Sequence, residues 1–364
     1  MIRVAQVMGY MDGGGVEQVV MNYYRHIDRS HVQFDFLVCE GSGIVPREEI
    51  EGLGGRVFTV PGYKDLPRYM GTMERLFRGE RWPIVHSHVN ALSVFPLRAA
   101  KRAGVPVRIA HSHSTSGKGE HARNAAKTVL RRLSRVYPTD LASCGVYAGE
   151  WLFGKGAGFT VFPNAVELDT FAFDPSVRKE VRAELGIRDG VLAIGHLGRF
   201  VTQKNHAFLL RSFARVRELR PDAVLLLAGE GPLLEDARAL AGSLGLGGFV
   251  RFLGRRGDAC RLYQAFDAFA LPSLYEGFCV VGVEAQAAGL PCLFSDAVSR
   301  EVGLSPVARF LPLDERIWAA ALADIGAGGH DRRMPEGVRA YGIEGAAARL
   351  LSYYEDLIAK ESEG

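Results

Sequence analysis

The chain has 364 residues, 48% of them hydrophobic and 23% charged, and its formal net charge at pH 7 is +3. This length predicts about two globular domains, each able to bury a core without disulfide or metal staples. We find no signal peptide and no apolar run of about 18 residues, so we expect no membrane-spanning helix. The five cysteines form no CxxC pair and no zinc spacing, which indicates reduced thiols in a cytoplasmic protein.

Short β-branched segments alternate with amphipathic segments in the first half of the chain. We predict helices over residues 16–27, 92–103 and 124–136. We predict buried strands over residues 2–8, 34–40, 56–60, 83–89, 107–113 and 140–145. This alternation is typical of a parallel, doubly wound α/β sheet.

The same alternation restarts after residues 160–176, where Pro and Asn interrupt it. The expected strands are 191–199, 223–231, 250–254, 268–272 and 291–295, and the expected helices are 206–219, 233–244, 260–266 and 344–360. We therefore predict two Rossmann-like domains, over residues 1–168 and 169–345, and a C-terminal helix within 346–364. Two such domains predict a cleft with its ligand at the carboxyl ends of the strands.

The charge is distributed unevenly between the two halves. Residues 1–168 contain 21 Lys and Arg against 15 Asp and Glu, whereas the remainder contains 23 against 26. A basic first half suits an anionic partner, although chance variation of the surface charge remains an alternative. We find no nucleic-acid reader motif and no basic patch interleaved with aromatic residues, so we expect no nucleic-acid partner.

Several loops that follow predicted strands carry candidate binding residues. The glycines of GYMDGGGVEQVV (9–20), including Gly14 and Gly15, precede a helix whose first N–H groups could face a phosphate; a flexible turn is the alternative. In LGRFVTQKNH (197–206), Arg199 and Lys204 could neutralise a diphosphate or could be solvated. In LLLAGEGP (225–232), Glu230 could face the cleft or cap a helix.

Two His-Ser-His units end neighbouring predicted strands, at His86–His88 and His111–His113. A metal site is conceivable for such clusters, but no carboxylate or thiol accompanies them, and we favour hydrogen bonding to a ligand. We take side chains at a strand end to alternate faces, so that only one histidine of each unit need point at the cleft.

The stretch YEGFCVVGVEAQAAGLPCLF (275–294) carries two glutamates eight positions apart, Glu276 in a loop and Glu284 inside a predicted helix. The helix start would leave the N–H groups from Phe278 to Val280 free for phosphate oxygens. A carboxylate can accept two hydrogen bonds from a vicinal diol, at about 1.5–3 kcal/mol each. Two ordinary helix glutamates are the alternative.

Taken together, the chain resembles the retaining family 4 glycosyltransferases of the GT-B fold, in particular bacterial exopolysaccharide and capsule enzymes. The resemblance spans essentially the whole chain, and it implies that the C-terminal helix within residues 346–364 crosses back to pack on the N-terminal domain. Its motifs are GGGVE (13–17), PNAVE (163–167), GR-x4-KN (198–205), GEGPL (229–233) and EGFxxxxxEAxAxGxP (276–291).

The resemblance implies roles for individual residues. Arg199 and Lys204 would hold the donor diphosphate, and His111 and Glu276 would contact the donor sugar. Glu284 would bind the ribose, with Glu230 near the base. The phosphates would be lined by Gly14, Gly15, Gly198, Gly277, Phe278, Cys279 and Val280. Cys279 stands where a glycine is common, and its small side chain should preserve backbone access.

The resemblance also implies a nucleotide-sugar co-substrate, most simply a UDP-sugar, and a glycan or polyprenyl-pyrophosphate-linked acceptor near His88 and Asn90. No Asp-x-Asp motif occurs, which fits an enzyme without a metal or other cofactor. Arg123, Lys127, Arg131 and Arg135 recur every fourth residue, and this basic stripe is a candidate contact for an anionic membrane surface or a lipid-linked acceptor. A solvated helix face is the alternative.

Other functions on the same fold remain open from the sequence. A sugar-nucleotide epimerase would use the same donor site, whereas a phosphorylase would need a cofactor lysine that nothing marks. A binding protein without catalytic activity could keep the pocket, although the intact glutamate pair and GR-x4-KN segment argue against decay.

Overall fold

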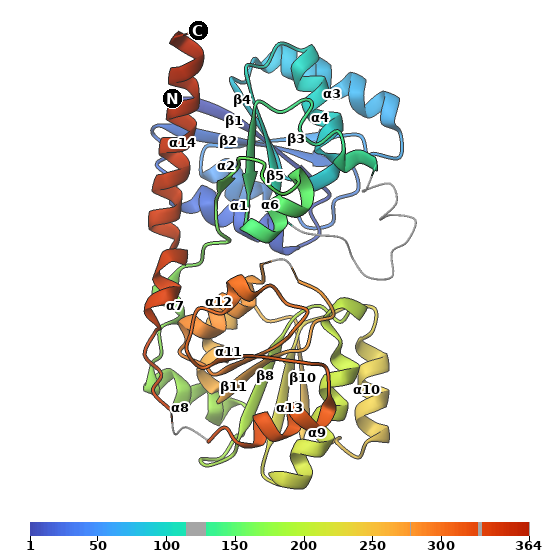
Figure 1. The fold of residues 1–364 in the computed structure, drawn as a ribbon, viewed down its shortest axis with the longest axis vertical. Helices are drawn as coiled ribbons and strands as arrows, with labels where there is room; N and C mark the ends of the chain where they lie inside the picture. The colour runs from blue at the N-terminus through green and yellow to red at the C-terminus, as the bar shows by residue number, and fades with distance from the viewer. Residues whose placement is uncertain (114–128, 277, 327–329, 364) are drawn as a thin grey trace. The chain divides into compact units, whose positions relative to one another are not determined.

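The computed structural model describes residues 1–113, 129–276, 278–326 and 330–363. These residues form two compact units, one comprising residues 1–166 together with 341–364, the other comprising residues 167–340 (Figure 1). The first boundary lies two residues before the one predicted from the sequence. The C-terminal helix, including residues that we had assigned to the second domain, belongs to the first unit.

The first unit contains a parallel sheet of seven strands in the order β3-β2-β1-β4-β5-β6-β7, counted over the described residues. The strands are β1 (Ile2–Gly9), β2 (Val32–Cys39), β3 (Arg56–Val60), β4 (Ile84–Ser87), β5 (Val107–Ser112), β6 (Asp140–Ser143) and β7 (Thr160–Val161). The helices are α1 (Gly15–His26), α2 (Arg47–Gly52), α3 (Leu66–Glu80), η1 (Asn90–Ser93), α4 (Val94–Arg102), α6 (Val146–Phe153) and α14 (Ile343–Glu363).

The second unit contains a parallel sheet of six strands in the order β10-β9-β8-β11-β12-β13, again counted over the described residues. The strands are β8 (Ala193–Leu197), β9 (Val224–Ala228), β10 (Val250–Gly254), β11 (Ala268–Leu271), β12 (Cys292–Ser295) and β13 (Ala308–Leu311). The helices are α7 (Leu168–Phe171), α8 (Pro175–Glu184), η2 (Thr202–Lys204), α9 (His206–Leu219), α10 (Leu234–Ser243), α11 (Ala259–Ala265), α12 (Val280–Ala287), η3 (Arg300–Val302), α13 (Glu315–Ala323) and η4 (Glu336–Tyr341).

Both sheets follow the doubly wound order, in which successive strands are added first toward one edge of the sheet and then, from one point on, toward the other edge. The reversal lies between β1 and β4 in the first unit and between β8 and β11 in the second. In open α/β sheets, ligands bind outside the carboxyl ends of the strands at this point. The order therefore selects the loops after β1, β4, β8 and β11 as the places to look for a site.

The second unit is held by a core that the sequence pattern anticipates. Along α9, Leu209, Phe213 and Val216 recur at spacings of three and four and are fully buried against the sheet. The predicted bounds of this helix, 206–219, are confirmed. Because α9 is anchored along its length, the loop that precedes it is held in a fixed place at the end of β8.

The C-terminal helix α14 packs against α1 in the first unit. Tyr354 of α14 is fully buried, and its hydroxyl lies 3.2 Å from Gln6 Nε2 of β1 and 2.7 Å from His86 Nδ1 of β4. Among the described residues, no helix is both long and apolar enough to cross a membrane.

The predicted helix over residues 124–136 is wrong beyond residue 131, and residues 124–128 lie outside the described part of the chain. Residues 132–136 form successive turns, in which the amides of Arg132, Leu133 and Ser134 donate to the carbonyls three residues earlier. Pro138 follows shortly after, where continuation of an α-helix is disfavoured. Arg131 and Arg135 therefore do not keep the four-residue helical spacing that we had inferred.

Candidate functional site

The loop after β8 and the loop after β11 are joined at the switch point of the second unit. Asn205 Nδ2 donates to the Pro272 carbonyl at 3.2 Å, and the Leu274 amide donates to the Gln203 carbonyl at 2.8 Å. Asn205 adopts the left-handed conformation, with φ of 56°, which asparagine tolerates better than most residues. Asn205 therefore positions the loop that carries Lys204, a role that sequence reasoning missed although the residue lies inside the GR-x4-KN motif.

Lys204 and Glu276 form an ion pair across these two loops. Lys204 Nζ lies 2.6 Å from Glu276 Oε1, and their side chains are 15% and 10% exposed. Ser273 donates a further hydrogen bond of 2.9 Å to the same oxygen. Burial alone would lower the pKa of Lys204, but the neighbouring Glu276 carboxylate raises it above the ordinary value. Lys204 is therefore held in its protonated form at the carboxyl edge of the sheet, paired with the Glu276 carboxylate.

Glycines of the GEGPL motif allow the loop after β9 to contact the loop after β8 through the backbone. A Cβ at Gly229, where φ is 143°, would lie 2.1 Å from the Gly198 carbonyl oxygen. A Cβ at Gly231 would lie 2.5 Å from the Phe200 carbonyl oxygen. Hydrogen bonds from the Phe200 amide to the Glu230 carbonyl, and from the Leu233 amide to the Phe200 carbonyl, join the loops. Glycine is required at both positions because the two backbones approach too closely to leave room for a side chain.

The structure places Glu230 and Arg199 at the surface of the same edge. Both side chains are exposed, and the described residues form no ion pair with Arg199. The backbone carbonyl of Glu230 serves the loop contact just described. Their side chains are therefore accessible to solvent and to a ligand.

Helix α12 begins directly after the loop that carries Glu276. Cys279 is its N-cap, with extended backbone; the Gly282 amide donates to the Cys279 carbonyl at 3.1 Å, whereas the Val280 and Val281 amides precede the first intrahelical acceptor. Phe278 and Cys279 are buried and Val280 is half-buried, whereas Gly277 lies outside the described residues. Burial raises the pKa of the Cys279 thiol to about 12, so this cysteine is neutral.

Glu284 lies one turn inside α12, as the sequence predicted. Its carboxylate is half-buried and accepts a hydrogen bond of 2.9 Å from the Tyr263 hydroxyl of α11. Burial raises the pKa of Glu284 to about 7, while the hydrogen bond from Tyr263 acts in the opposite direction. Tyr263 is a partner that the sequence did not identify, because it comes from a distant helix.

In the first unit, backbone amides of the glycine loop after β1 are hydrogen-bonded to a glutamate of the helix that follows. Glu17 accepts hydrogen bonds from the Gly14 amide at 2.7 Å and from the Asp12 amide at 3.1 Å. The Gly14 amide therefore points at a carboxylate within the chain, not at an open site. Gly15 begins α1, and a Cβ there would meet nothing within 4 Å.

The four histidines at the ends of β4 and β5 form one buried cluster, so the premise that the two side chains of each unit lie on alternate faces is wrong. Residues two apart on a strand share a face, and therefore all four rings lie together. His86 Nε2 lies 3.0 Å from His111 Nδ1, and His88 Nδ1 lies 2.8 Å from His113 Nε2. The nitrogens of His86, His88 and His111 approach within 4.8 Å of one another, but the contacts among them are hydrogen bonds.

The remaining residues that we proposed for the acceptor or the membrane have different surroundings and do not form one site among the described residues. Asn90, with a left-handed φ of 51°, accepts a hydrogen bond of 2.7 Å from the His113 amide through its side-chain oxygen. Arg131 lies over the Trp151 ring, with its guanidinium carbon 5.1 Å from the ring centroid, and Arg135 is exposed. Arg123 and Lys127 lie outside the described residues.

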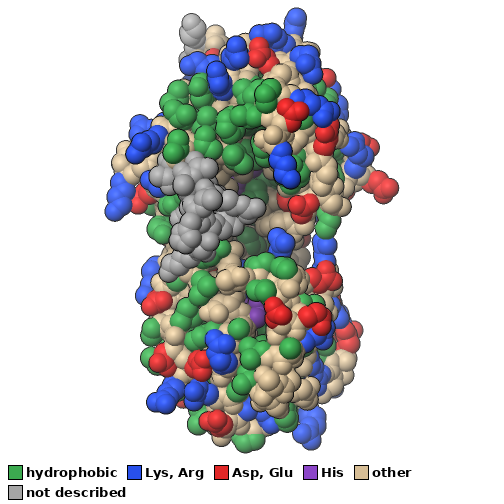
Figure 2. All heavy atoms as spheres, turned by 90° about the vertical axis from the view of Figure 1, so that its right-hand side faces the viewer, with side chains coloured by type: hydrophobic (Ala, Val, Ile, Leu, Met, Phe, Trp, Pro, Cys, Tyr) green, Lys and Arg blue, Asp and Glu red, His purple; other side chains and the backbone are tan. Residues whose placement is uncertain are grey.

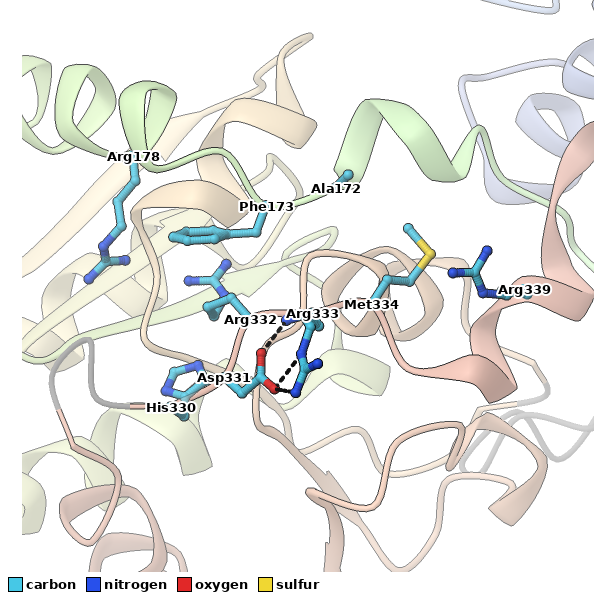
Figure 3. A pocket seen from close by; sticks show the side chains of 9 residues that line it. All are labelled: Ala172, Phe173, Arg178, His330, Asp331, Arg332, Arg333, Met334 and Arg339. Carbon is cyan, nitrogen blue, oxygen red and sulfur yellow. Dashed lines mark hydrogen bonds and ion pairs between the residues drawn. The ribbon is translucent and has the colours of Figure 1, made fainter.

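A pocket of about 610 Å³ in the second unit is lined by several arginines, but it is not formed by the motif residues (Figure 3). Arg332 donates to the carbonyls of Ala288, Phe266 and Tyr263, and Arg178 donates to Gln264 and Phe266. These guanidinium groups satisfy carbonyls at the C-terminal ends of α11 and α12, where cations are favoured. Their role is accounted for by the fold.

Comparison with known proteins gives the family. The model described as "Glycosyl transferases group 1" matches residues 177–301, and that described as "Glycosyl transferase 4-like domain" matches residues 14–142. The chain is 41% identical over 345 residues to "Putative glycosyltransferase EpsF" of Bacillus subtilis, covering 91% of this chain and 89% of that protein.

Two further proteins agree with this assignment. The chain is 28% identical over 319 residues to the "UDP-Gal:alpha-D-GlcNAc-diphosphoundecaprenol alpha-1,3-galactosyltransferase" of Escherichia coli, covering 81% of this chain and 79% of that protein. The crystal structure of Anabaena Alr3699/HepE in complex with UDP matches with a TM-score of 0.77 at 17% identity, covering 98% of this chain and all of that one. The chain therefore belongs to the group 1, family 4-like glycosyltransferases with the GT-B fold.

Proposed function

We propose that this glycosyltransferase moves a sugar from a UDP-sugar to a glycan or polyprenyl-pyrophosphate-linked acceptor in the synthesis of an exopolysaccharide or another cell-surface glycan. The observation that carries the proposal is the Lys204–Glu276 pair, 2.6 Å apart at the switch point and at the start of α12. A buried cation, a helix N-terminus and a carboxylate together match the phosphates and hydroxyls of a nucleotide sugar. The names of the Escherichia coli relative and of the Anabaena complex favour uridine as the base.

In this proposal, each residue acts on one part of the donor. Lys204 and the exposed Arg199 stabilise the charge that develops on the departing diphosphate, as preorganised cations do in other transferases. The hydrogen bonds that Glu276 accepts from Lys204 and Ser273 both go to Oε1, so we assign Oε2 to the hydroxyls of the donor sugar. Glu284 accepts hydrogen bonds from the ribose.

We further propose that the sugar keeps its anomeric configuration and that no metal is required. Lys204, Arg199 and the first-turn amides of α12 supply the electrostatic stabilisation that a metal provides elsewhere. The two glutamates have separate roles here and are not the acid and nucleophile of a retaining glycosidase. A front-face displacement follows, in which the leaving phosphate oxygen takes the proton of the acceptor hydroxyl. Proton NMR of the product formed by a stopped reaction reports the configuration, and activity in excess chelator reports on metal.

The proposal is tested by measuring the hydrolysis and transfer of UDP-, GDP- and ADP-sugars. Replacing Glu276→Gln or Lys204→Met should lower kcat with the preferred donor by about 10²- to 10³-fold, because each removes a charge aimed at the reacting groups. Glu235→Gln, which alters a glutamate whose side chain is 83% exposed, is the matched control and should leave kcat unchanged. Tight donor binding without turnover by the unaltered protein would instead indicate a binding protein.

A further inference from the structure

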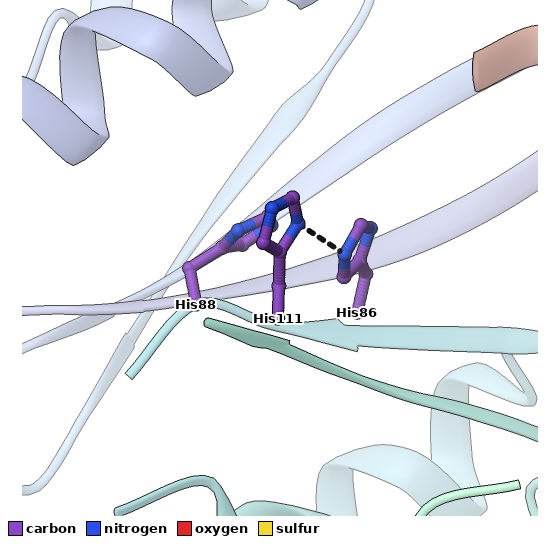
Figure 4. Close-up of side chains that lie close together, drawn as sticks. All are labelled: His86, His88 and His111. Atoms are coloured by element: carbon purple, nitrogen blue, oxygen red, sulfur yellow. Dashed lines mark hydrogen bonds between the residues drawn. The ribbon is translucent and has the colours of Figure 1, made fainter. Parts of the chain in front are cut away.

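Four buried histidines in the first unit are joined into two hydrogen-bonded chains, and part of this cluster is drawn in Figure 4. In the first chain, Tyr354 contacts His86 at 2.7 Å and His86 contacts His111 at 3.0 Å. In the second chain, Gln6 contacts His88 at 2.8 Å and His88 contacts His113 at 2.8 Å. The histidines are at most 7% exposed.

A single amide connects the two chains at their inner ends. Gln6 Nε2 donates to the Tyr354 hydroxyl at 3.2 Å, while Gln6 Oε1 lies against His88 Nε2. The amide therefore acts as a donor to the first chain and as an acceptor from the second. A neutral imidazole has one donor and one acceptor nitrogen. The role of the amide at the start of each chain therefore determines which nitrogen of every following histidine carries the proton.

The first chain ends in a donor. The Tyr354 oxygen accepts from Gln6, so its own proton is free to be donated to His86 Nδ1. His86 must then carry its proton on Nε2 and donate it to His111 Nδ1. His111 in turn carries its proton on Nε2, a buried atom that has no hydrogen-bond partner among the described residues.

The second chain ends in an acceptor. His88 donates from Nε2 to the Gln6 oxygen, so its Nδ1 accepts from His113 Nε2. This leaves a lone pair on His113 Nδ1, which is also buried and without a hydrogen-bond partner in the described part of the chain. The His111 and His113 rings stack with centroids 4.0 Å apart, so the free donor and the free acceptor belong to neighbouring rings.

The chains require neutral rings, and the surroundings provide this condition. Burial, together with the neighbouring imidazoles, holds the pKa of His86, His88 and His111 well below the ordinary range. Burial lowers the pKa of His113 to about 3. All four histidines therefore remain uncharged near neutral pH, and each has a definite tautomer.

We propose that Gln6 and Tyr354 are positioning residues that fix these tautomers, so that His111 offers an N–H and His113 a lone pair to one substrate hydroxyl. A hydroxyl group both donates and accepts, which makes it the complement of this pair. The histidines border a cavity of about 20 Å³, which is the size of one water molecule or hydroxyl group. The identity of that hydroxyl as part of a sugar depends on the proposed function, whereas the setting of the tautomers does not.

The tautomers are measured directly by nitrogen NMR of the full chain labelled with ¹⁵N-histidine, without any substrate. We expect all four histidines to carry the proton on Nε2. Tyr354→Phe removes the donor to His86, so His86 and His111 should become mixtures of both tautomers, while His88 and His113 stay unchanged. Tyr353→Phe is the matched control, since Tyr353 is the preceding residue of α14 and its ring packs on Phe162 and on Tyr354.

The same variants separate this inference from the proposed function. If a donor is turned over, Tyr354→Phe should lower kcat/KM by about two- to tenfold, which corresponds to one net hydrogen bond, and Tyr353→Phe should not. If no donor is turned over, the NMR result still decides the tautomers. A proton on Nδ1 of His111 in the unaltered protein, or an unchanged His111 in Tyr354→Phe, overturns the inference. Should Tyr354→Phe fail to fold, Gln6→Leu tests the same link and should release all four histidines.

Discussion

At the scale of single residues, Glu284 shows a conflict between folding and binding. The half-buried carboxyl has a pKa of about 7, raised by burial above the ordinary value of 4.5. Between these two pH values the native state holds a proton that the unfolded state has lost. Stability therefore falls as pH rises through this window, because the native state binds more protons. A neutral side chain would suit the fold better, and the proposed contact with the donor ribose would account for a carboxylate at this position.

Donor binding should consequently strengthen as Glu284 ionises. A carboxylate accepts hydrogen bonds from both ribose hydroxyls, whereas the protonated acid accepts fewer. We expect the Kd for an intact UDP-sugar to fall about tenfold between pH 6 and pH 8, as the ionised fraction rises around a pKa of about 7. An intact sugar nucleotide is needed because the terminal phosphate of UDP itself titrates near pH 6.

Glu284→Gln supplies the control for this pH dependence. The amide oxygen can still accept from Tyr263, but the side chain no longer titrates. We expect weak binding at both pH values, together with a gain of about 1–3 kcal/mol in the free energy of unfolding at pH 8. Calorimetry and chemical denaturation measure the two quantities. A Kd for the unaltered protein that is constant from pH 6 to pH 8 contradicts the assignment of Glu284 to the ribose.

At the scale of elements, the site depends on how closely three loops approach one another. Gly229 has φ of 143° and no space for a Cβ beside the Gly198 carbonyl. Gly229→Ala should lower the free energy of unfolding by about 2–4 kcal/mol and displace the loop carrying Lys204. Gly242→Ala in α10, where a Cβ meets nothing within 4 Å, should be neutral or stabilise by up to about 1 kcal/mol. Equal melting temperatures for the two variants would refute the close-approach argument.

The sequence predicted those elements whose pattern is local and strong. The second-unit helix at 206–219 and the strands at 56–60 and 250–254 have the predicted bounds, because their apolar spacing alone is decisive. The short edge strand β13 was not predicted, since its four residues become a strand only by pairing with β12. The sequence motifs predicted candidate site residues. The roles of Ser273, Tyr263 and Gln6 could not be predicted in this way, because they depend on contacts with other segments of the chain that residue spacing does not encode.

The histidine cluster shows a different kind of error. The His-Ser-His spacing implies that the two histidine side chains of each unit lie on the same face of their strand. Their pairing across β4 and β5 needs the parallel register, in which His86 stands opposite Ile109 and Ser87 opposite Ala110. Spacing within each strand was therefore readable from the sequence, but the hydrogen bonds between the strands were not.

At the scale of the whole molecule, the C-terminal helix links the chain end to the interior of the first unit. Tyr354 of α14 reaches both β1 and β4, so the final segment of the chain takes part in the histidine cluster. The first unit is also the more basic half of the sequence. On the face drawn in Figure 2, hydrophobic side chains gather on this unit, while positive and negative side chains are interspersed over the molecule.

The region from Val129 to Val136 combines exposed apolar and basic side chains, which suits attachment to an anionic membrane. Val129, Leu133 and Val136 are 62%, 40% and 49% exposed. Arg132 and Arg135 are exposed beside them. Each cation near an anionic surface contributes about 1 kcal/mol, and exposed apolar side chains add burial in the interface. We propose that the protein binds peripherally, on the inner face of the cytoplasmic membrane, where a lipid-linked acceptor would be found.

Vesicle sedimentation tests this attachment with the full chain. The unaltered protein should bind vesicles that contain anionic lipid, bind neutral vesicles much less, and be released by salt. Changing Arg131, Arg132 and Arg135 to Glu should abolish binding. Changing Lys179, Arg316 and Arg339 of the second unit to Glu alters the net charge equally and should leave much of the binding intact. If both variants lose binding to the same degree, net charge alone is responsible and the region from Val129 to Val136 is not the membrane contact.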